Sequence, residues 1–356
     1  MTTEQTSKLI ELIGTEHPII QGPFGGGNSS VDLVAAVSNR GGLGSFGSEG
    51  QSPEEILSTA AAVRARTNQP FNLNLWVSKS DVSAGGPTDE DLDRYWKLFE
   101  PYFDELGLPY PDLSPRMTRP TLEEQLEALF AARPRVFSFV FGVPAKPVLE
   151  ECRRLGITTL GAATSIDEAV ALDDAGVDLI LATGAEAGGH RVSFLGRPED
   201  QLMGTFTLTQ LIERRVTRPV IAAGGIADGA AVRAMRTIGA AGVQVGTAFL
   251  ACEESGADPL HRDALFSPDA ESTTLSRAMT GRLARGLSNR WLRDMADRTA
   301  DLAPFPLQGW FFAQLKEAAV RAGRTDLHAL YSGQIAPNLR HRRAAELMDD
   351  LIAGTA

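Results

Sequence analysis

The chain has 356 residues, of which 43% are hydrophobic and 22% charged, and it carries a formal net charge of −11. This composition indicates a globular protein with a large core, either one α/β barrel with additions or two smaller domains. The acidic balance and the lack of a basic stripe in the sequence argue against a nucleic-acid binder and suit a protein that handles small molecules.

Cysteine usage and the N-terminal residues predict a cytoplasmic protein. Cys152 and Cys252 are too few for a disulfide framework or a zinc ligand set, and we interpret both as buried thiols. The polar stretch 1–16 lacks the apolar core of a signal peptide, and no apolar run in the sequence approaches the roughly 20 residues that span a bilayer. We therefore expect neither a metal centre nor a membrane span.

Eight short segments rich in apolar, β-branched or glycine residues are predicted to be strands. They are apolar throughout rather than alternating, which is typical of parallel strands covered on both faces. The predicted strands are residues 18–22, 42–47, 71–77, 136–142, 158–164, 178–184, 219–225 and 242–249.

Most of these segments are followed by a helical pattern with clear ends. The helix at 53–66 starts with Ser52 as N-cap and a proline in the first turn, and the helix at 165–175 starts with a capping box from Ser165 to Glu168. Further helices are predicted at 30–39, 144–155, 207–215 and 228–238. Strand and helix in alternation predict a TIM (β/α)8 barrel, which the eight regular units favour over an open doubly wound sheet.

Two stretches exceed what a barrel requires. Residues 78–133 form a long insertion after the third strand, with helix-like patterns at 90–106, which is rich in aromatic residues, and at 121–132. Because this insertion leaves from the end of the barrel that carries chemistry, it is either a lid or pocket wall, or else a packing elaboration or oligomer contact. Residues 256–356 are expected to form a C-terminal helical extension that packs on the barrel of residues 1–255.

Glycine-dense loops directly follow the last three predicted strands. The seventh strand ends in Gly224 and Gly225, and the eighth ends in Gly246 and Thr247. In a barrel these loops meet at one face, where their amides and a helix start can surround a phosphate group. The loops therefore predict a phosphate-binding cup, the alternative being glycines needed only for tight turns.

The cofactor that suits this arrangement is FMN. A convincing Rossmann fingerprint is missing from the sequence. Instead, a glycine loop at 22–27 follows the first strand, where bare backbone can pass over a flat ring. Asn74, on the third strand, can hydrogen-bond a flavin, or it can be a polar residue satisfied inside the barrel.

His190 follows the sixth strand by a short glycine loop, so we expect it over the same face of the barrel. Imidazole titrates near neutrality and can exchange a proton with a small acid or hold it electrostatically. The remaining histidines lie at a strand entrance or in the tail, and we interpret them as structural or surface residues: His17, His261, His328 and His341.

Four motifs of the sequence form a specific set. They are His-Pro-Ile-Ile-Gln-Gly-Pro at 17–23, Leu-Val-Ala-Ala-Val-Ser-Asn-Arg-Gly-Gly-Leu-Gly at 33–44, Gly-Ala-Glu-Ala-Gly-Gly-His-Arg at 184–191 and Val-Gln-Val-Gly-Thr-Ala-Phe at 243–249. Together they resemble the nitronate monooxygenase family, formerly called 2-nitropropane dioxygenases. The likeness resumes at 284–289 and 332–334.

The resemblance implies non-covalent FMN and oxidation of alkyl nitronates by O2 to a carbonyl compound and nitrite. It implies that His190 is the active-site histidine, acting as a base or as a partner for the anionic nitronate. By matching motif it implies FMN contacts at Pro23, Phe24, Gly25, Asn74, Gly188, Gly189, Gly224, Gly225, Gln244, Gly246 and Thr247, with Tyr331, Ser332 and Gln334 of the tail covering the flavin.

Alternatives to this activity stay open at the level of sequence. FMN-dependent enoyl reductases of fatty-acid synthesis share the fold and the glycine-glycine-histidine loop, so an NAD(P)H-dependent enoyl-thioester reductase is one alternative, and another flavin-dependent oxidation is a second. The expected partners are a small-molecule substrate and O2, with no nucleic acid and no membrane. The sequence leaves the oligomeric state open, a homodimer being one option.

Overall fold

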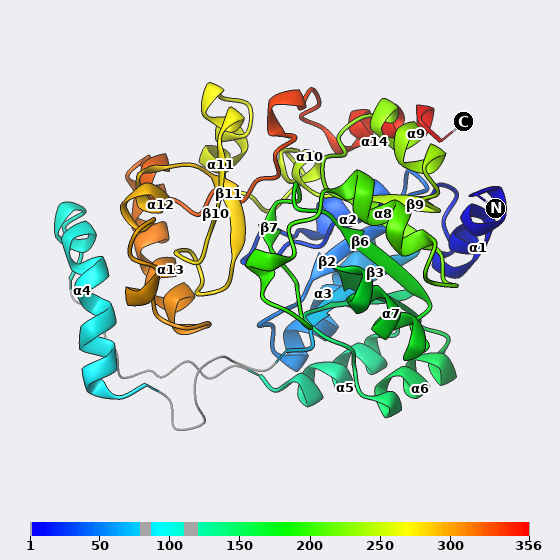
Figure 1. Ribbon diagram of the computed structural model, residues 1–356, viewed down its shortest axis with the longest axis horizontal. Coiled ribbons are helices and arrows are strands. Elements are labelled where there is room, and N and C mark those ends of the chain that lie inside the picture. Colours follow the sequence, from blue (N-terminus) through cyan, green and yellow to red (C-terminus); the bar gives the residue numbers. More distant parts are fainter. Residues whose placement is uncertain (1, 79–86, 110–119, 356) are drawn as a thin grey trace.

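The computed structural model describes residues 2–78, 87–109 and 120–355, and its main body is a barrel of eight parallel strands (Figure 1). Around the barrel the strands follow the order β1, β9, β8, β6, β5, β4, β3, β2. They are β1 (Ile19–Gln21), β2 (Gly44–Gly47), β3 (Phe71–Trp76), β4 (Val136–Val140), β5 (Thr158–Ala163), β6 (Leu179–Thr183), β8 (Val220–Ala223) and β9 (Gly242–Val245). Each lies within a predicted segment, so the predicted barrel is confirmed.

Main-chain hydrogen bonds between β1 and the residue before β2 close the barrel. The amide of Gln21 donates to the carbonyl of Leu43, and the amide of Leu43 donates to the carbonyl of Ile19, both at 2.9 Å. Ile20 and Leu43 accordingly form a parallel bridge. This junction decides between the two predicted architectures, because an open doubly wound sheet would leave β1 and β2 as separate edges.

Helices cover the outside of the barrel. Ser52 is the N-cap of α3 (Pro53–Arg66), as predicted, and in addition forms a capping box with Glu55. The capping box predicted from Ser165 to Glu168 is only half formed. The Glu168 carboxylate turns inward and accepts from Thr164 and from the amides of the loop at 194–195, because burial there demands several donors. The covering helices are α2 (Val31–Ser38), α3 (Pro53–Arg66), α5 (Leu122–Ala132), α6 (Lys146–Leu155), α7 (Ile166–Asp174), α8 (Thr205–Glu213), α9 (Gly229–Thr237) and α14 (Ala344–Ala353).

The last barrel strand is shorter than its apolar sequence suggests. β9 ends at Val245, and the short helix α10 (Thr247–Leu250) begins two residues later. Between them Gly246 adopts φ −103° and ψ −82°, outside the extended region, and so turns the chain. The predicted strand at 242–249 is therefore wrong over its second half, and this half instead presents the N-terminus of a helix to the mouth of the barrel.

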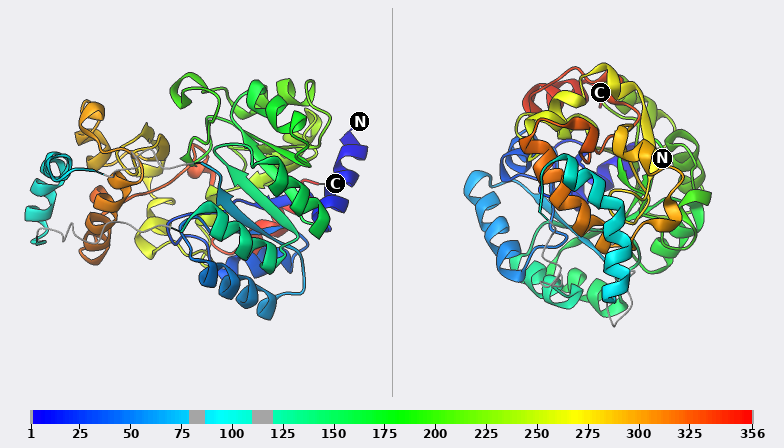
Figure 2. Two further views of the ribbon diagram at one scale, coloured as in Figure 1. Left: turned by 90° about the horizontal axis from the view of Figure 1, so that it is seen from below. Right: turned by 90° about the vertical axis from the view of Figure 1, so that its left-hand side faces the viewer.

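Helix α1 (Thr2–Ile13) closes the end of the barrel opposite the carboxyl ends of its strands (Figure 2, left). Leu9 and Ile13 are fully buried and belong to the same apolar cluster as Ile20, Val136 and Leu179 of the barrel interior. With that end filled by apolar side chains, the opposite mouth is where a ligand can enter the barrel.

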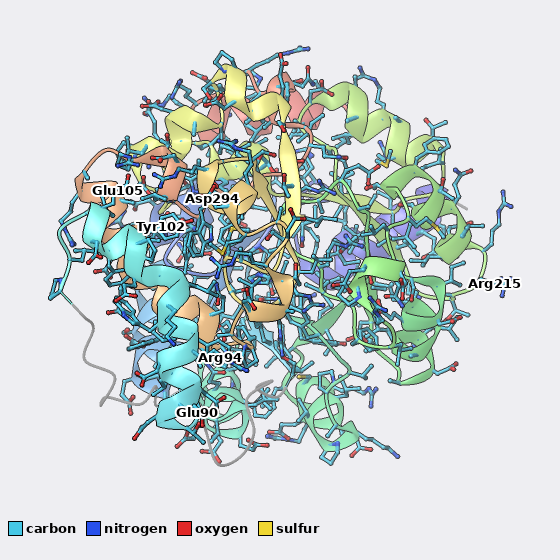
Figure 3. All side chains as sticks on the ribbon, turned by 60° about the vertical axis from the view of Figure 1, so that its left-hand side comes forward. Glu90, Arg94, Tyr102, Glu105, Arg215 and Asp294 are labelled. Carbon is cyan, nitrogen blue, oxygen red and sulfur yellow. The ribbon has the colours of Figure 1, made fainter. Side chains whose placement is uncertain are left out.

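A second apolar cluster joins the insertion to the tail. The helices that contribute to it lie beside the barrel (Figures 1 and 2). Helix α4 (Asp89–Glu105) packs against α12 (Arg290–Asp294) and α13 (Leu307–Arg321). Phe99 is fully buried there, with its ring centroid 5.0 Å from that of Trp291 and 5.2 Å from that of Phe311. At the edge of this cluster the hydroxyl of Tyr102 donates to Asp294 Oδ2 at 2.8 Å (Figure 3).

The insertion at 78–133 thus contains α4 and α5, close to the two predicted helices, while its residues 79–86 and 110–119 lie outside the described residues. The aromatic side chains of α4 face α12 and α13. This placement supports the packing interpretation of α4 over the interpretation as a lid.

The tail also contains strands, in addition to the predicted helices. β10 (Thr273–Ser276) and β11 (Ala284–Leu287) form an antiparallel pair, and β11 pairs in turn with β7 (Gly189–His190), the short strand after β6. In this small sheet Ala284 lies opposite His190. The tail is therefore hydrogen-bonded directly to the loop that carries the histidine. The tail also contains the short helix α11 (Pro259–Ala264).

Candidate active site

A cavity of about 580 Å³ lies at the carboxyl ends of the barrel strands, between the barrel and the tail. Its volume is within the range of cofactor sites, about 300–1,000 Å³. Fourteen of the fifteen residues proposed from the sequence line it: Pro23, Phe24, Gly25, Asn74, Gly188, Gly189, His190, Gly224, Gly225, Gln244, Gly246, Thr247, Tyr331 and Ser332. The exception is Gln334, whose side chain is exposed and does not line the cavity.

Glycines form one side of the cavity with bare backbone. A Cβ atom added at Gly25, Gly189 or Gly246 would meet no atom within 4 Å, because it would project into the cavity itself. Gly224 and Gly225 have φ values of 113° and 72°, which an L side chain rarely adopts. These loops therefore make a cradle that leaves amides and Cα atoms free to contact a ligand closely.

Polar side chains in the cavity have hydrogen-bonding capacity that the protein leaves unused. Thr183 Oγ1, at the end of β6, is buried without a hydrogen-bond partner among the described residues. Asn74 is 5% exposed and donates through Nδ2 to Ser138 Oγ at 3.0 Å, so one of the two N–H groups of its amide has a protein partner. Since buried polar atoms are almost always paired, the lone Thr183 oxygen indicates a partner supplied by a ligand or by water.

A short segment of the tail, residues 331–334, crosses the mouth of the barrel, and we call it the strap. The amide of Gly333 donates to Thr247 Oγ1 at 2.9 Å, and the amide of Gln334 donates to the carbonyl of Glu186 at 3.0 Å. His261 Nε2 donates to the carbonyl of Tyr331 at 2.8 Å. The strap thereby adds Tyr331 and Ser332 to the cavity wall, and Gln334 contributes through its backbone.

His190 is held on the cavity wall from three directions. Its backbone belongs to β7, and the next residue, the buried Arg191, donates to the carbonyls of Thr183 and Gly184 at 3.2 and 2.6 Å. Its Nε2 is 2.8 Å from Thr280 Oγ1. Its ring meets the indole of Trp76 edge-on, and these contacts together fix the position of the imidazole.

The surroundings of His190 keep its imidazole neutral. Burial and, to a smaller extent, the positive charge of Arg282 lower the pKa of His190 to about 3. Arg282 is 8% exposed, and its guanidinium carbon lies 4.2 Å from the ring centroid of Phe305 and 4.5 Å from that of Phe141. Such cation–π contacts hold a positive charge where water is largely excluded. At neutral pH the histidine is therefore a neutral hydrogen-bonding group, and the permanent charge nearby belongs to Arg282.

The sequence interpretation missed the cavity residues that come from the tail and from the end of β3. They share an apolar or aromatic character, apart from Thr280 and Lys316, and they are Trp76, Met279, Thr280, Phe305, Trp310, Phe312 and Lys316. Burial lowers the pKa of the Lys316 ammonium. The run Trp310 to Phe312 was a detectable signal, because three consecutive aromatic residues in a helix cannot all face one core.

Within the described ranges no cluster of three or more His, Cys, Asp or Glu side chains could hold a metal ion. Of the helices that the structure describes, none has the length and apolar character needed to cross a bilayer.

Comparison with known proteins identifies the family. The family model described as nitronate monooxygenase matches residues 6–354. The chain belongs to the nitronate monooxygenase family. As a member of the nitronate monooxygenase family it is an enzyme of the oxidoreductase class, and the resemblance drawn from the four sequence motifs is confirmed.

Individual relatives of the nitronate monooxygenase family match over almost the whole chain. A nitronate monooxygenase of Pseudomonas aeruginosa is 38% identical over 351 residues, covering 98% of each chain. The crystal structure of a nitroalkane oxidase from Streptomyces ansochromogenes is similar with a TM-score of 0.88 and 34% identity, covering 98% of this chain and 97% of that one. FabK from Thermotoga maritima is similar with a TM-score of 0.73 and 25% identity, covering 97% and 94%.

Proposed function

We propose that this protein binds FMN in the cavity and uses O2 to oxidise alkyl nitronates to a carbonyl compound and nitrite. The observation that carries the proposal is the meeting, in one cavity, of the glycine cradle and His190, in a chain that matches nitronate monooxygenases along its length. The redox chemistry would come from the flavin, whose ring exchanges electrons with substrate and O2.

The residues of the barrel mouth suit the phosphate and ring of FMN. Backbone amides at Gly224, Gly225 and Gly246, together with the N-terminus of α10, would hold the phosphate group. Thr183, Asn74 and Gln244 bring polar atoms to the same cavity for the ring and the sugar chain. In this interpretation the protein positions the cofactor through backbone atoms that no substitution of a side chain can remove.

The opposite side of the cavity suits the organic substrate. Trp76, Phe305, Trp310 and Phe312 make an apolar wall that keeps water from the reacting atoms. Lys316 brings a positive charge to this wall, which attracts an anionic nitronate. His190 lies between the wall and the glycine cradle, and its neutral ring acts there by hydrogen bonding or proton transfer.

The proposal is tested with the purified protein. We expect it to be yellow, to release FMN on denaturation, and to consume O2 while producing nitrite from propionate 3-nitronate and from longer alkyl nitronates. A colourless protein that does not bind added FMN at micromolar concentration would contradict the proposal at its first step.

The same preparation separates the alternatives. An NAD(P)H-dependent enoyl-thioester reductase would bleach its flavin rapidly on anaerobic mixing with NADPH. We expect no rapid bleaching, together with nitrite release from a nitronate in air. Bleaching without nitrite release would favour the reductase.

A further inference from the structure

The hydroxyl of Thr280 lies at the centre of three polar contacts. Thr280 Oγ1 is 2.8 Å from His190 Nε2, 3.3 Å from the amide nitrogen of Arg282 and 3.4 Å from the carbonyl oxygen of Arg282. The residues concerned belong to the turn between β10 and β11, and β11 pairs with the strand that contains His190. The contact between Thr280 and His190 is therefore fixed by the sheet that joins the tail to the barrel.

The number of hydrogen bonds that the Thr280 hydroxyl can donate and accept favours one tautomer of His190. A threonine hydroxyl has one hydrogen to donate and two lone pairs that accept. If its hydrogen goes to the carbonyl of Arg282, its lone pairs accept from the Arg282 amide and from His190 Nε2–H, so all three contacts become hydrogen bonds. If instead it donates to Nε2, the contact with the carbonyl is lost and His190 must carry its proton on Nδ1.

A proton on Nδ1 would have no protein partner. In the part of the chain that the structure describes, Nδ1 of His190 makes no hydrogen bond, and the ring neighbours are the aromatic side chains of Trp76, Phe141 and Tyr331. His190 lines the cavity, and its Nδ1 is not one of the buried polar atoms that lack a partner, so Nδ1 faces the cavity and not the packed interior. The three contacts of Thr280 therefore favour a proton on Nε2, which leaves a lone pair on Nδ1 in the cavity.

We propose that Thr280 is a positioning residue that fixes His190 as the Nε2–H tautomer, which makes Nδ1 a proton acceptor in the cavity. The chemical role of this tautomer rests on the proposed function. The tautomer favours His190 as a base over His190 as a hydrogen-bonding partner for the anionic nitronate, the two roles that the sequence left open. A group with only a lone pair cannot donate a hydrogen bond to the oxygens of a nitronate. It can take a proton from a neutral nitroalkane.

Transfer of a proton from the nitroalkane to His190 Nδ1 requires no oxidant. The Cα–H bond of the nitroalkane breaks and an Nδ1–H bond forms, giving an imidazolium. The electron pair of the C–H bond becomes the C=N bond of the nitronate, and the negative charge moves to the nitro oxygens. A nitronate formed beside the ring stabilises the imidazolium, because an opposite charge within a few ångströms favours the charged form of a base. The protein would thus generate its own nitronate from a neutral precursor.

The tautomer is measured directly by NMR of protein labelled with ¹⁵N in its five histidines. Protonated and unprotonated ring nitrogens resonate far apart, and His190→Asn identifies the signals of His190. We expect the FMN-free and FMN-loaded protein to show Nε2 protonated and Nδ1 unprotonated. In Thr280→Val this preference should be lost, and in Thr280→Ser it should be kept. A proton on Nδ1 in the unmodified protein, or an unchanged tautomer in Thr280→Val, would overturn the assignment.

Kinetics provide the second measurement, with nitroethane and its preformed nitronate as paired substrates. Groups that orient metal-bound histidines contribute about 10- to 100-fold to activity, and we apply the same range to Thr280. We expect Thr280→Val to lose this factor in kcat/KM for nitroethane while kcat/KM for the nitronate stays within about 2-fold, and Thr280→Ser to resemble the unmodified protein. Equal losses on both substrates would overturn the role of Thr280. If the unmodified protein oxidised neither, the proposed function would be wrong, and the NMR measurement would still decide the tautomer.

Discussion

The imidazole of His190 meets the indole of Trp76 edge-on, with ring centroids 4.9 Å apart and an angle of 74° between the planes. Trp76 in turn contacts Phe141 at 4.7 Å and Phe305 at 5.4 Å between centroids. The end of β3, the loop after β4 and the tail thus converge on one histidine. This convergence gives His190 surroundings that a glycine loop alone could not provide.

Replacing His190 by alanine should reduce turnover of a neutral nitroalkane by about 10²–10⁴-fold, the usual contribution of a positioned proton acceptor. Steady-state nitrite release measures the effect, and His17→Asn, which changes a histidine outside the cavity, serves as the control. Because the glycine cradle is unchanged, FMN content should remain near one per chain. Unchanged turnover in His190→Ala would remove this histidine from the mechanism.

Replacing Gly246 by alanine should weaken FMN binding without destabilising the FMN-free protein. The added methyl group meets no protein atom within 4 Å and projects into the cavity. Filling a well-packed site with one methyl group costs about 1–3 kcal/mol, equivalent to roughly 5- to 150-fold in affinity. Fluorescence titration with FMN measures the change, and urea unfolding of the FMN-free protein checks stability.

The matched control for Gly246→Ala is Gly309→Ala on α13. A methyl group at Gly309 would make ordinary contacts of 3.6–3.8 Å with Thr280, on the side of the cavity that we assign to the substrate. FMN affinity in this variant should be unchanged. If both variants bound FMN equally well, the phosphate would lie elsewhere than the loops after β8 and β9.

Replacing Phe99 by alanine should lower the free energy of unfolding by about 3–5 kcal/mol, as expected for a buried aromatic side chain. Phe99 is fully buried between Trp291 and Phe311, and α4 contributes no residue to the cavity within the described ranges. Urea unfolding measures the loss, and kcat measured well below the unfolding transition should stay within about 2-fold. A large fall in kcat with little loss of stability would instead make α4 part of a lid.

The stability of the FMN-free protein should depend on pH through His190. Its pKa is about 3 in the folded state, against roughly 6.5 for an unfolded chain. Between these values the unfolded state binds a proton that the folded state does not, so the free energy of unfolding falls as pH falls, by up to about 1.4 kcal/mol per pH unit. Above pH 6.5 His190 is neutral in both states, so the free energy of unfolding no longer changes with pH through this residue.

His190→Asn should remove the pH dependence that His190 causes, and the free energy of unfolding should then change less with pH. Urea unfolding at intervals between pH 7 and 4.5 measures both slopes. His261, whose pKa burial lowers to about 4, titrates in both proteins and cancels in the comparison. Parallel curves for the two proteins would show that His190 titrates normally in the folded state.

The barrel could be predicted from the sequence because each parallel strand is buried on both faces and therefore reads as a short apolar run. The loops that follow the strands could be placed at one mouth for the same reason, since a closed parallel sheet brings all carboxyl ends together. The end of β9 was harder, because Val245 and Ala248 are both buried although only the first is in a strand. Burial alone does not distinguish a strand from a short helix.

The cavity residues that come from the tail could not be predicted from apolar strand patterns. Thr280 is 90 residues from His190 in sequence, and it reaches the histidine through an antiparallel pairing of β11 with a two-residue strand. So short a strand has no periodicity to detect. For α4 the helix and its aromatic residues could be predicted, but their packing partners could not. The partners Trp291 and Phe311 lie about 200 residues further along the chain, after most of the barrel.

The strap has a consequence for how the enzyme matures. Residues 331–334 form hydrogen bonds with Glu186 and Thr247 and complete the wall of the cavity. During synthesis the barrel strands leave the ribosome before the strap does, so the mouth of the barrel stays open until the strap has been made. A cofactor bound at this mouth would therefore be enclosed only once the strap has docked onto Glu186 and Thr247.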